Sequence, residues 1–166
     1  DAVIQAESGF MDLNGEKDGP PLKMPVALVD VLAAHQLKEG LLLALLKKEQ
    51  TGEGSRVEVS LMETALASLA NQATNWLVGG TIPSRKGSAH PNIAPYGDTF
   101  TTSDDKLLLL AVGNDKQFEN LMKALGLNPA DPEWSSFKTN PGRVKSRDAL
   151  NARLSRAILR YRSDHL

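Results

Sequence analysis

The sequence predicts an α/β protein, because segments with helical periodicity alternate with short segments that are typical of strands. Apolar residues recur at helical spacing over residues 31–50, and polar and apolar residues then alternate over residues 56–60. Residues 99–102 and 106–112, which Ser103-Asp104-Asp105 separates, are typical of a β-hairpin. These three observations indicate helices and strands in one chain.

The composition allows a real core and favours specific small partners. The chain has 166 residues, of which 41% are hydrophobic, so we expect one domain or two small lobes. The 19 Lys and Arg residues nearly cancel the 20 Asp and Glu residues, so no overall field attracts nucleic acid or an anionic membrane. We expect small-molecule or protein partners, with no nucleic acid and no membrane.

The absence of cysteine excludes disulfides, thiolate metal sites and a cysteine nucleophile. It fits a reducing compartment, and we expect the cytoplasm, with the mitochondrial matrix as the alternative. The longest apolar run, residues 107–112, is too short to span a bilayer, and no signal peptide is visible. The chain starts at Asp1 without an initiator methionine, so we expect an internal fragment whose targeting signal is unknown.

In the first half, glycine and proline concentrate over residues 15–25, which predicts a loop that leads into Val26. Residues 31–50 predict one long helix with lysines in its last turn, and residues 51–54 predict the turn into the strand over 56–60. A second helix is expected over 61–78, where Gly79-Gly80 ends it.

In the second half, residues 81–98 form a poorly periodic stretch with three prolines, long enough to suggest a functional loop. After the hairpin, residues 115–125 predict an amphipathic helix that Gly126 closes. Residues 143–161 predict a last amphipathic helix with an arginine-rich, solvated surface.

Short motifs with a known mechanism are missing from the chain. It has no phosphate-binding loop, dinucleotide fingerprint, zinc helix or Gly-x-Ser-x-Gly elbow. His35, His90 and His165 fall in a helix, a loop and the terminus, so they form no ligand pattern. We expect no metal site.

Asp30 is the only charged residue between Lys23 and Lys38, which predicts a partly buried carboxylate. The simpler interpretation is that it caps the long helix, since an Asp there accepts backbone N–H bonds and meets the positive end of the helix dipole. The same geometry suits a carboxylate that attacks an activated carbonyl. Capping and nucleophilic attack do not exclude one another.

Two other features are candidates for binding. His90 in the long loop can donate to a substrate carboxylate, and the alternative is a rigid turn with a surface histidine. The arginines after residue 143 suit phosphate binding, but their spacing surrounds the helix, so a solvated face is the preferred interpretation.

The stretch Lys48–Leu61 is similar to the helix-turn-strand signature of family III coenzyme A transferases, and it follows Asp30 at the spacing of that family. Segments upstream of Asp30 also resemble the approach to the family's nucleophilic aspartate. The matching segments are 1–5, 8–9, 15, 18–21, 48–61, 87–91, 95–96, 100, 113–114, 118, 137–140, 143–144 and 147. They look closest to members that act on short dicarboxylic acids such as succinate and glutarate.

The resemblance implies a covalent mechanism. Asp30 would attack a donor acyl-CoA, and an acceptor carboxylate would complete the exchange through an aspartyl-CoA thioester. Asp1 would contact coenzyme A, and Gly87, Ser88 and His90 would belong to the substrate loop over the acyl group. Coenzyme A would be a substrate, with no permanently bound cofactor and no metal.

The resemblance also implies the domain organisation. Residues 1–78 would be part of a large Rossmann-like domain, 79–98 a linker and site loop, and 99–166 a small α+β domain that is incomplete at its C-terminus. The family forms interlocked homodimers, so a homodimer is expected. The parts that supply most coenzyme A contacts are missing, and the fragment alone is expected to be inactive.

Two alternatives stay open. The chain lacks the consecutive glycines that oxalate and formate members carry over the nucleophile, which leaves the substrate undetermined. The racemase branch of the family places a His just before the position of Asp1, although Gly113-Asn114 favours a transferase. A catalytically inactive interaction fragment is the alternative outside enzyme classes.

Overall fold

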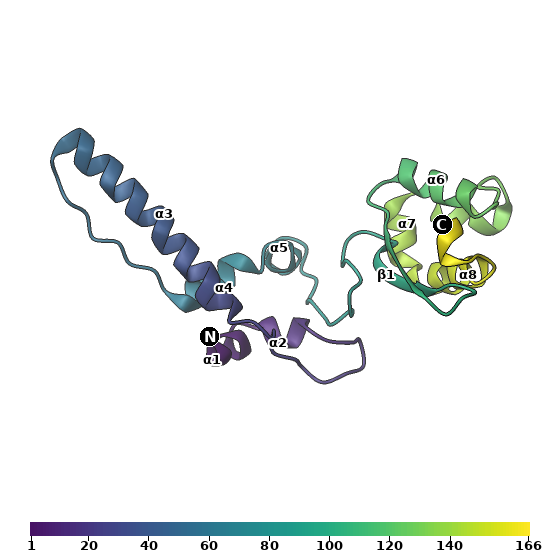
Figure 1. Ribbon diagram of the computed structural model, residues 1–166, viewed down its shortest axis with the longest axis horizontal. Helices are drawn as coiled ribbons and strands as arrows, with labels where there is room; N and C mark the ends of the chain where they lie inside the picture. Colours follow the sequence, from purple (N-terminus) through teal and green to yellow (C-terminus); the bar gives the residue numbers. More distant parts are fainter. The chain divides into compact units, whose positions relative to one another are not determined.

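The computed structural model describes residues 1–166, which divide into two compact units, Asp1–Gly87 and Ser88–Leu166. The first unit consists of helices joined by extended segments, and the second combines helices with a small antiparallel sheet (Figure 1). The α/β class is therefore supported at the level of mixed helix and strand. No helix is both long enough and apolar enough to cross a bilayer.

The first unit contains five helices: α1 (Ala2–Glu7), α2 (Phe10–Leu13), α3 (Leu28–Thr51), α4 (Leu61–Ser68) and α5 (Asn71–Leu77). The predicted long helix is confirmed as α3, which begins three residues earlier than expected and ends at Thr51, with Gly52 as its C-cap. It packs against α4, where the buried Thr64 hydroxyl donates to Gln36 Oε1 at 2.9 Å. Beyond this contact the leucines of α3 lie exposed.

The strand predicted over residues 56–60 is wrong. This segment is extended but pairs with no other strand, and it runs beside α3 (Figure 1). The side chain of Val57 lies so close to Gly40 of α3 that a Cβ there would meet it. Alternation of polar and apolar residues makes a segment extended, but a strand also needs a hydrogen-bonding neighbour.

The single helix predicted over 61–78 is two helices. Ser60 caps α4 by accepting from the Glu63 main-chain N–H at 3.4 Å. Ala70 then adopts a positive φ of 48°, which interrupts the helix before α5 begins at Asn71. No Gly or Pro stands at this break, so no local residue pattern predicts it.

The second unit is built around one hairpin. β1 (Tyr96–Thr101) pairs antiparallel with β2 (Leu107–Ala111), with Phe100 opposite Leu108. The predicted hairpin is confirmed, with β1 beginning three residues early. The predicted helix over 115–125 is confirmed as α6 (Asp115–Ala124), which Asn114 caps through a 2.9 Å bond from Gln117 N–H.

The remaining elements complete a closed core. They are the 3-10 helix η1 (Pro132–Phe137), the helices α7 (Asn140–Lys145) and α8 (Arg147–Ile158), and the short 3-10 helix η2 (Ser163–His165). Phe118, Met122, Leu150 and Leu154 are among the buried apolar residues that pack beneath the sheet in one cluster.

The prediction of a single solvated helix over residues 143–161 is wrong in two respects. It breaks at Ser146, which separates α7 from α8. Its arginines are not all solvated, because Arg143 is completely buried and the side chain of Arg147 is only 15% exposed. Both guanidinium groups find carbonyl and carboxylate acceptors, which compensate for the water that they lose.

Candidate functional site

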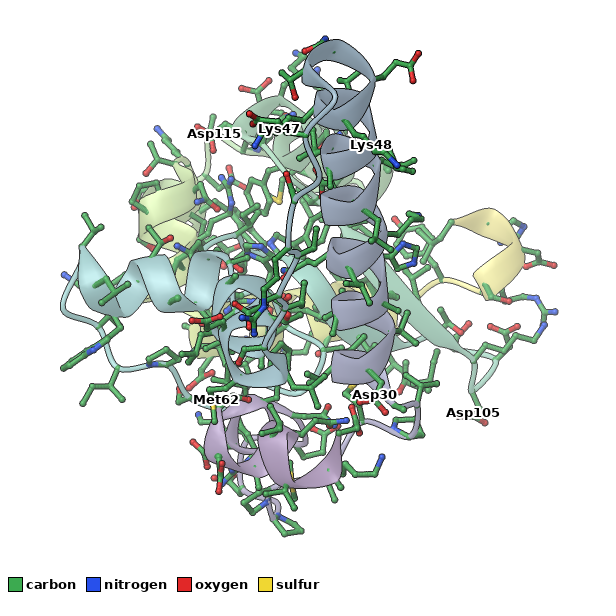
Figure 2. The ribbon with its side chains drawn as sticks, turned by 90° about the vertical axis from the view of Figure 1, so that its left-hand side faces the viewer. Asp30, Lys47, Lys48, Met62, Asp105 and Asp115 are labelled. Carbon is green, nitrogen blue, oxygen red and sulfur yellow. The ribbon has the colours of Figure 1, made fainter.

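Asp30 lies in the first turn of α3, and its carboxylate is exposed, with 54% of the side chain accessible. Figure 2 shows Asp30 at one end of this helix and Lys47 and Lys48 at the other. The expectation of a partly buried carboxylate is wrong, because the helix turns Val29 inward and Asp30 outward. The partial positive charge of the helix N-terminus still favours an anionic group at this position.

Asp30 does not cap α3. The N-cap residue is Ala27, which has no side chain able to accept a hydrogen bond. The carboxylate that binds the free N–H groups of α3 belongs to Asp1, whose Oδ1 accepts from Val29 N–H at 2.9 Å. Asp1 therefore takes the stabilising role that the simpler interpretation gave to Asp30.

Asp1 and Asp30 lie next to one another. The main-chain nitrogen of Asp1 is 3.5 Å from Asp30 Oδ1, and the Asp1 side chain is only 9% exposed. Lys23 Nζ lies 3.9 Å from Asp1 Oδ2. Two carboxylates and one ammonium group thus gather at the start of α3.

Gln5 is a residue of this site that sequence reasoning missed. It is completely buried, and its Nε2 donates to Asp1 Oδ2 at 2.7 Å while its Oε1 accepts from Met24 N–H at 2.9 Å. A single glutamine in a short helix gives no signal of this role in the sequence. Gln5 ties α1 to the segment that leads into α3, and so it fixes where Asp30 emerges.

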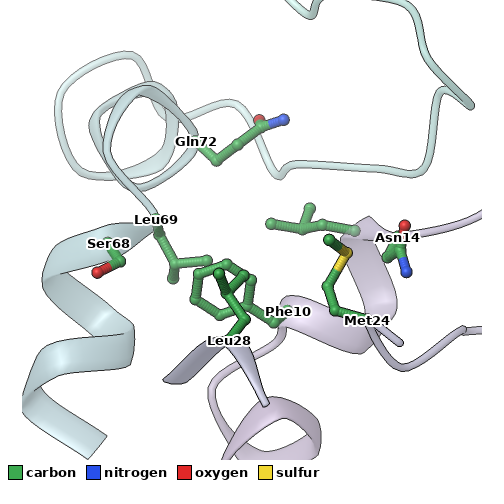
Figure 3. Close-up of a pocket in the computed structure, with 8 residues that line it drawn as sticks. Phe10, Asn14, Met24, Leu28, Ser68, Leu69 and Gln72 are labelled. Atoms are coloured by element: carbon green, nitrogen blue, oxygen red, sulfur yellow. The ribbon is translucent and has the colours of Figure 1, made fainter. Parts of the chain in front are cut away.

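An apolar pocket of about 310 Å³ opens beside the same segment (Figure 3). Phe10, Met24, Leu28 and Leu69 line it, and Leu28 precedes Asp30 by only two residues. Its lining is mainly apolar, and such a surface accepts a hydrocarbon group more readily than a charged one.

Gly87, Ser88 and His90 do not come together in one unit. Gly87 closes the first unit, where it has a φ of 59° and donates its N–H to Gly15 O at 3.0 Å. Ser88 and His90 belong to the second unit, where Ser88 Oγ donates to Gly97 O at 2.6 Å. A Cβ at Gly97 would lie 1.9 Å from Ser88 O, so only glycine allows β1 to pass this close to the loop.

His90 is held at its main chain and at its ring. Its N–H donates to Tyr96 O at 2.7 Å, and its ring meets that of Tyr96 edge to face at 5.6 Å. Its Nδ1 accepts from Asn92 N–H at 3.1 Å. His90 therefore has a defined orientation on a structured loop.

Sequence reasoning also missed that Arg143 and Arg147 hold the loop that contains His90. Arg143 donates to the carbonyl of Ala94 at 2.7 Å and pairs with Asp115 at 2.7 Å. Arg147 pairs with Asp98 at 2.6 Å and also contacts loop carbonyls. Charge pattern alone cannot tell a buried arginine from a solvated one, because both occur on amphipathic helices.

No three His, Asp or Glu side chains lie close enough together in residues 1–166 to form a metal site. The polar groups of these two regions are carboxylates, one lysine and one oriented histidine.

The whole chain, residues 1–166, matches the family described as CoA-transferase family III. It is 38% identical to the succinate–glutarate CoA-transferase of Agrobacterium fabrum over 97% of this chain and 40% of that protein. It is 34% identical to the succinyl-CoA:glutarate CoA-transferase of Homo sapiens over 90% of this chain and 34% of that protein.

A solved structure is similar as well. The crystal structure of a CaiB/BaiF family protein from Brucella suis is 38% identical and superposes with a TM-score of 0.70. The match covers 97% of this chain and 42% of that protein. The chain therefore spans about 40% of the length of the relatives that it matches.

Proposed function

The chain belongs to CoA-transferase family III, and from this premise we propose that the full protein transfers coenzyme A from a donor acyl-CoA to an acceptor carboxylic acid. Asp30 is the nucleophile of this proposal. The observation that carries it is the exposed Asp30 carboxylate at the start of α3, next to Asp1, which binds the Val29 N–H of this helix and accepts from the buried Gln5.

The proposed reaction runs through covalent intermediates on Asp30. Its carboxylate attacks the thioester carbonyl, and the thiolate of coenzyme A leaves as a mixed anhydride forms. The thiolate then attacks the aspartyl carbonyl, which releases the donor acid and leaves an aspartyl-CoA thioester. The acceptor carboxylate attacks the aspartyl carbonyl and expels the thiolate, which gives a second mixed anhydride. The thiolate then attacks the acyl carbonyl of the acceptor, which forms the new acyl-CoA and regenerates the Asp30 carboxylate.

The other site residues take supporting roles. Asp1 holds the start of α3 and lies where a coenzyme A contact is proposed. Gly87, Ser88 and His90 form the proposed substrate loop. Coenzyme A enters as a substrate, and the proposal needs no permanently bound cofactor.

The proposed acids are short dicarboxylates. What supports this class is the naming of the Agrobacterium and human relatives as succinate or succinyl-CoA and glutarate transferases. The apolar pocket beside Leu28 suits the short methylene chain of such an acid. The relatives reported above give no support to the racemase alternative, and we do not propose it.

The larger organisation is part of the same proposal. Residues 1–78 belong to a large Rossmann-like domain of the full protein, 79–98 to a linker, and 99–166 to a small α+β domain. The boundary between the two compact units, after Gly87, lies inside that proposed linker. We propose a homodimer in the cytoplasm as the working state.

Trapping of the acyl-enzyme tests the proposal. The full-length protein is incubated with succinyl-CoA and hydroxylamine, and the modified peptide is mapped by mass spectrometry. The label is expected on Asp30, and Asp30→Ala is expected to abolish turnover. Glu39→Gln is the matched control, because Glu39 is another exposed carboxylate on α3. A label at another residue, or turnover in Asp30→Ala, would overturn the proposal.

A further inference from the structure

The loop between Ser88 and Pro95 is held by side chains from α7 and α8. Arg147 at the start of α8 donates through Nη2 to the carbonyl of Ile93 at 2.7 Å and to the carbonyl of His90. One planar guanidinium group therefore fixes two carbonyls of the loop at once, which a flexible ammonium group cannot do with the same geometry.

Asp98 compensates the charge of Arg147. Its side chain is 5% exposed, and its Oδ2 accepts from Arg147 Nη1 at 2.6 Å. The same oxygen accepts from Tyr96 N–H at 3.1 Å, and Oδ1 accepts from Asn151 Nδ2 at 2.7 Å. A buried carboxylate with this many donors holds the guanidinium in one position.

Asn140 at the start of α7 holds the same loop from a second point. Its Oδ1 accepts from Ala94 N–H at 3.1 Å, and its Nδ2 donates to Asn92 O at 2.8 Å. Arg147 and Asn140 together bind main-chain groups of residues 90, 92, 93 and 94. This support is denser than an ordinary surface turn requires.

The support has a chemical consequence at His90. Because Nδ1 of the ring accepts a hydrogen bond from Asn92 N–H, the neutral ring carries its proton on Nε2. The loop therefore presents one N–H donor with a fixed tautomer and a fixed direction.

We propose that Arg147, with Asp98 and Asn140, is a positioning residue for His90, and that His90 Nε2–H binds a carboxylate of the acid substrate. The inference rests on the proposed function, because it assigns the acid to this loop. A carboxylate oxygen is a strong acceptor for a preoriented N–H donor, and the Asp98 charge does not repel it, because Arg147 neutralises Asp98.

Kinetics of the full-length protein with succinyl-CoA and glutarate test the inference. Arg147→Lys is expected to lower kcat/KM for glutarate by about 100-fold, mainly through KM, because misplacement by about 1 Å has an effect of that size. His90→Ala is expected to do the same, and His90→Gln to recover part of the loss through its amide donor. Arg153→Lys is the matched control on α8, because Arg153 pairs with Glu133 and does not touch the loop.

A double variant separates positioning from general damage. If Arg147 acts through His90, Arg147→Lys combined with His90→Ala is expected to lose little more than either single change. Additive losses would overturn the inference. Equal KM values for glutarate in Arg147→Lys and in Arg153→Lys would also overturn it.

Amide hydrogen exchange provides a readout that needs no turnover. Exchange over residues 88–95 is expected to rise in Arg147→Lys and in Asn140→Ala, a milder variant that removes no buried charge, and to stay unchanged in Arg153→Lys. Equal exchange in all variants would overturn the positioning role. Absence of label on Asp30 in the wild-type protein would instead defeat the proposed function, so the two failures are distinguishable.

Discussion

The two units differ in where their apolar side chains lie. In Ser88–Leu166 the large apolar residues meet in one closed cluster that includes Phe118, Leu150 and Leu154. In Asp1–Gly87 only Val29 and Ala65 are buried among the apolar residues, and the leucines of α3 from Leu37 onward remain exposed. Asp30, in the first unit, therefore rests on a smaller buried apolar core than His90, in the second unit, and burial of apolar surface dominates folding free energy.

The largest expected effect appears when the units are separated. Residues 88–166 are expected to unfold cooperatively on their own, whereas residues 1–87 are expected to show no cooperative transition and to associate through exposed apolar surface. Circular dichroism during heating and sedimentation velocity measure both properties. A monomeric fragment 1–87 with a sharp transition would contradict the comparison.

Within the second unit, Arg143→Ala is expected to cost about 3–5 kcal/mol of unfolding free energy. The change leaves the carbonyls of Ala94 and Phe137 without their donor and removes a cation that lies 4.5 Å from the Phe118 ring. Urea unfolding gives the value. Arg153→Ala, which removes a pair between partly exposed side chains, is expected to cost about 0–1 kcal/mol, and equal losses would argue against the role of Arg143.

A pair of leucines compares the units directly. Leu154→Ala removes a side chain with no exposed surface and is expected to cost about 2–5 kcal/mol. Leu45→Ala removes one that is 61% exposed on α3 and is expected to change stability by about 0.5 kcal/mol or less. Chemical unfolding of the whole chain, followed by probes in each unit, checks the contrast. A large effect at Leu45 would mean that α3 buries its leucines in solution.

The smallest expected effect is a dependence on acid in the second unit. Hydrogen bonds to the Asp104 carboxylate hold its pKa well below the usual value of 3.8. The largest contribution comes from the Ser163 main-chain N–H and the next from the Thr102 hydroxyl. The folded state therefore gains stability from this carboxylate above about pH 4, and that gain is lost as the pH falls below 3.8 toward the folded pKa.

Urea unfolding of the second unit at pH 7 and at pH 2.5 measures the loss. Asp104→Asn is expected to be less stable than the wild type at pH 7 and to lose less on acidification. If the unfolding free energy of Asp104→Asn falls between pH 7 and pH 2.5 by as much as that of the wild type, other carboxylates account for the loss.

Sequence patterns predicted best what short-range interactions decide. The hairpin follows from two strand-like segments around a short turn, and α6 from an amphipathic pattern that Gly126 closes, all within a few residues. The strand over 56–60 failed because its existence depends on a neighbouring strand, which the chain does not provide. The break at Ala70 was invisible because no Gly or Pro stands there and alanine itself favours a helix.

The candidate site was predicted unevenly for the same reason. The place of Asp30 at the start of a long helix followed from the sequence, but its exposure did not, since flanking apolar residues do not reveal which way a side chain turns. The roles of Gln5 and Arg147 depend on partners far along the chain, at Met24 and at His90. Assignment of the nucleophile and of the substrate loop remains a prediction.

The break at Ser146 has a further consequence for how the protein can change. It lets two arginines four positions apart diverge, so that Arg143 enters the core while Arg147 pairs with Asp98, and both bind carbonyls of the 90–94 segment. The two adjoining helices thus carry both Arg143, which is buried in the core, and Arg147, which we propose positions His90. Substitutions on α7 or α8 that adjust stability are expected to alter substrate preference as well, so evolution cannot tune the two properties independently.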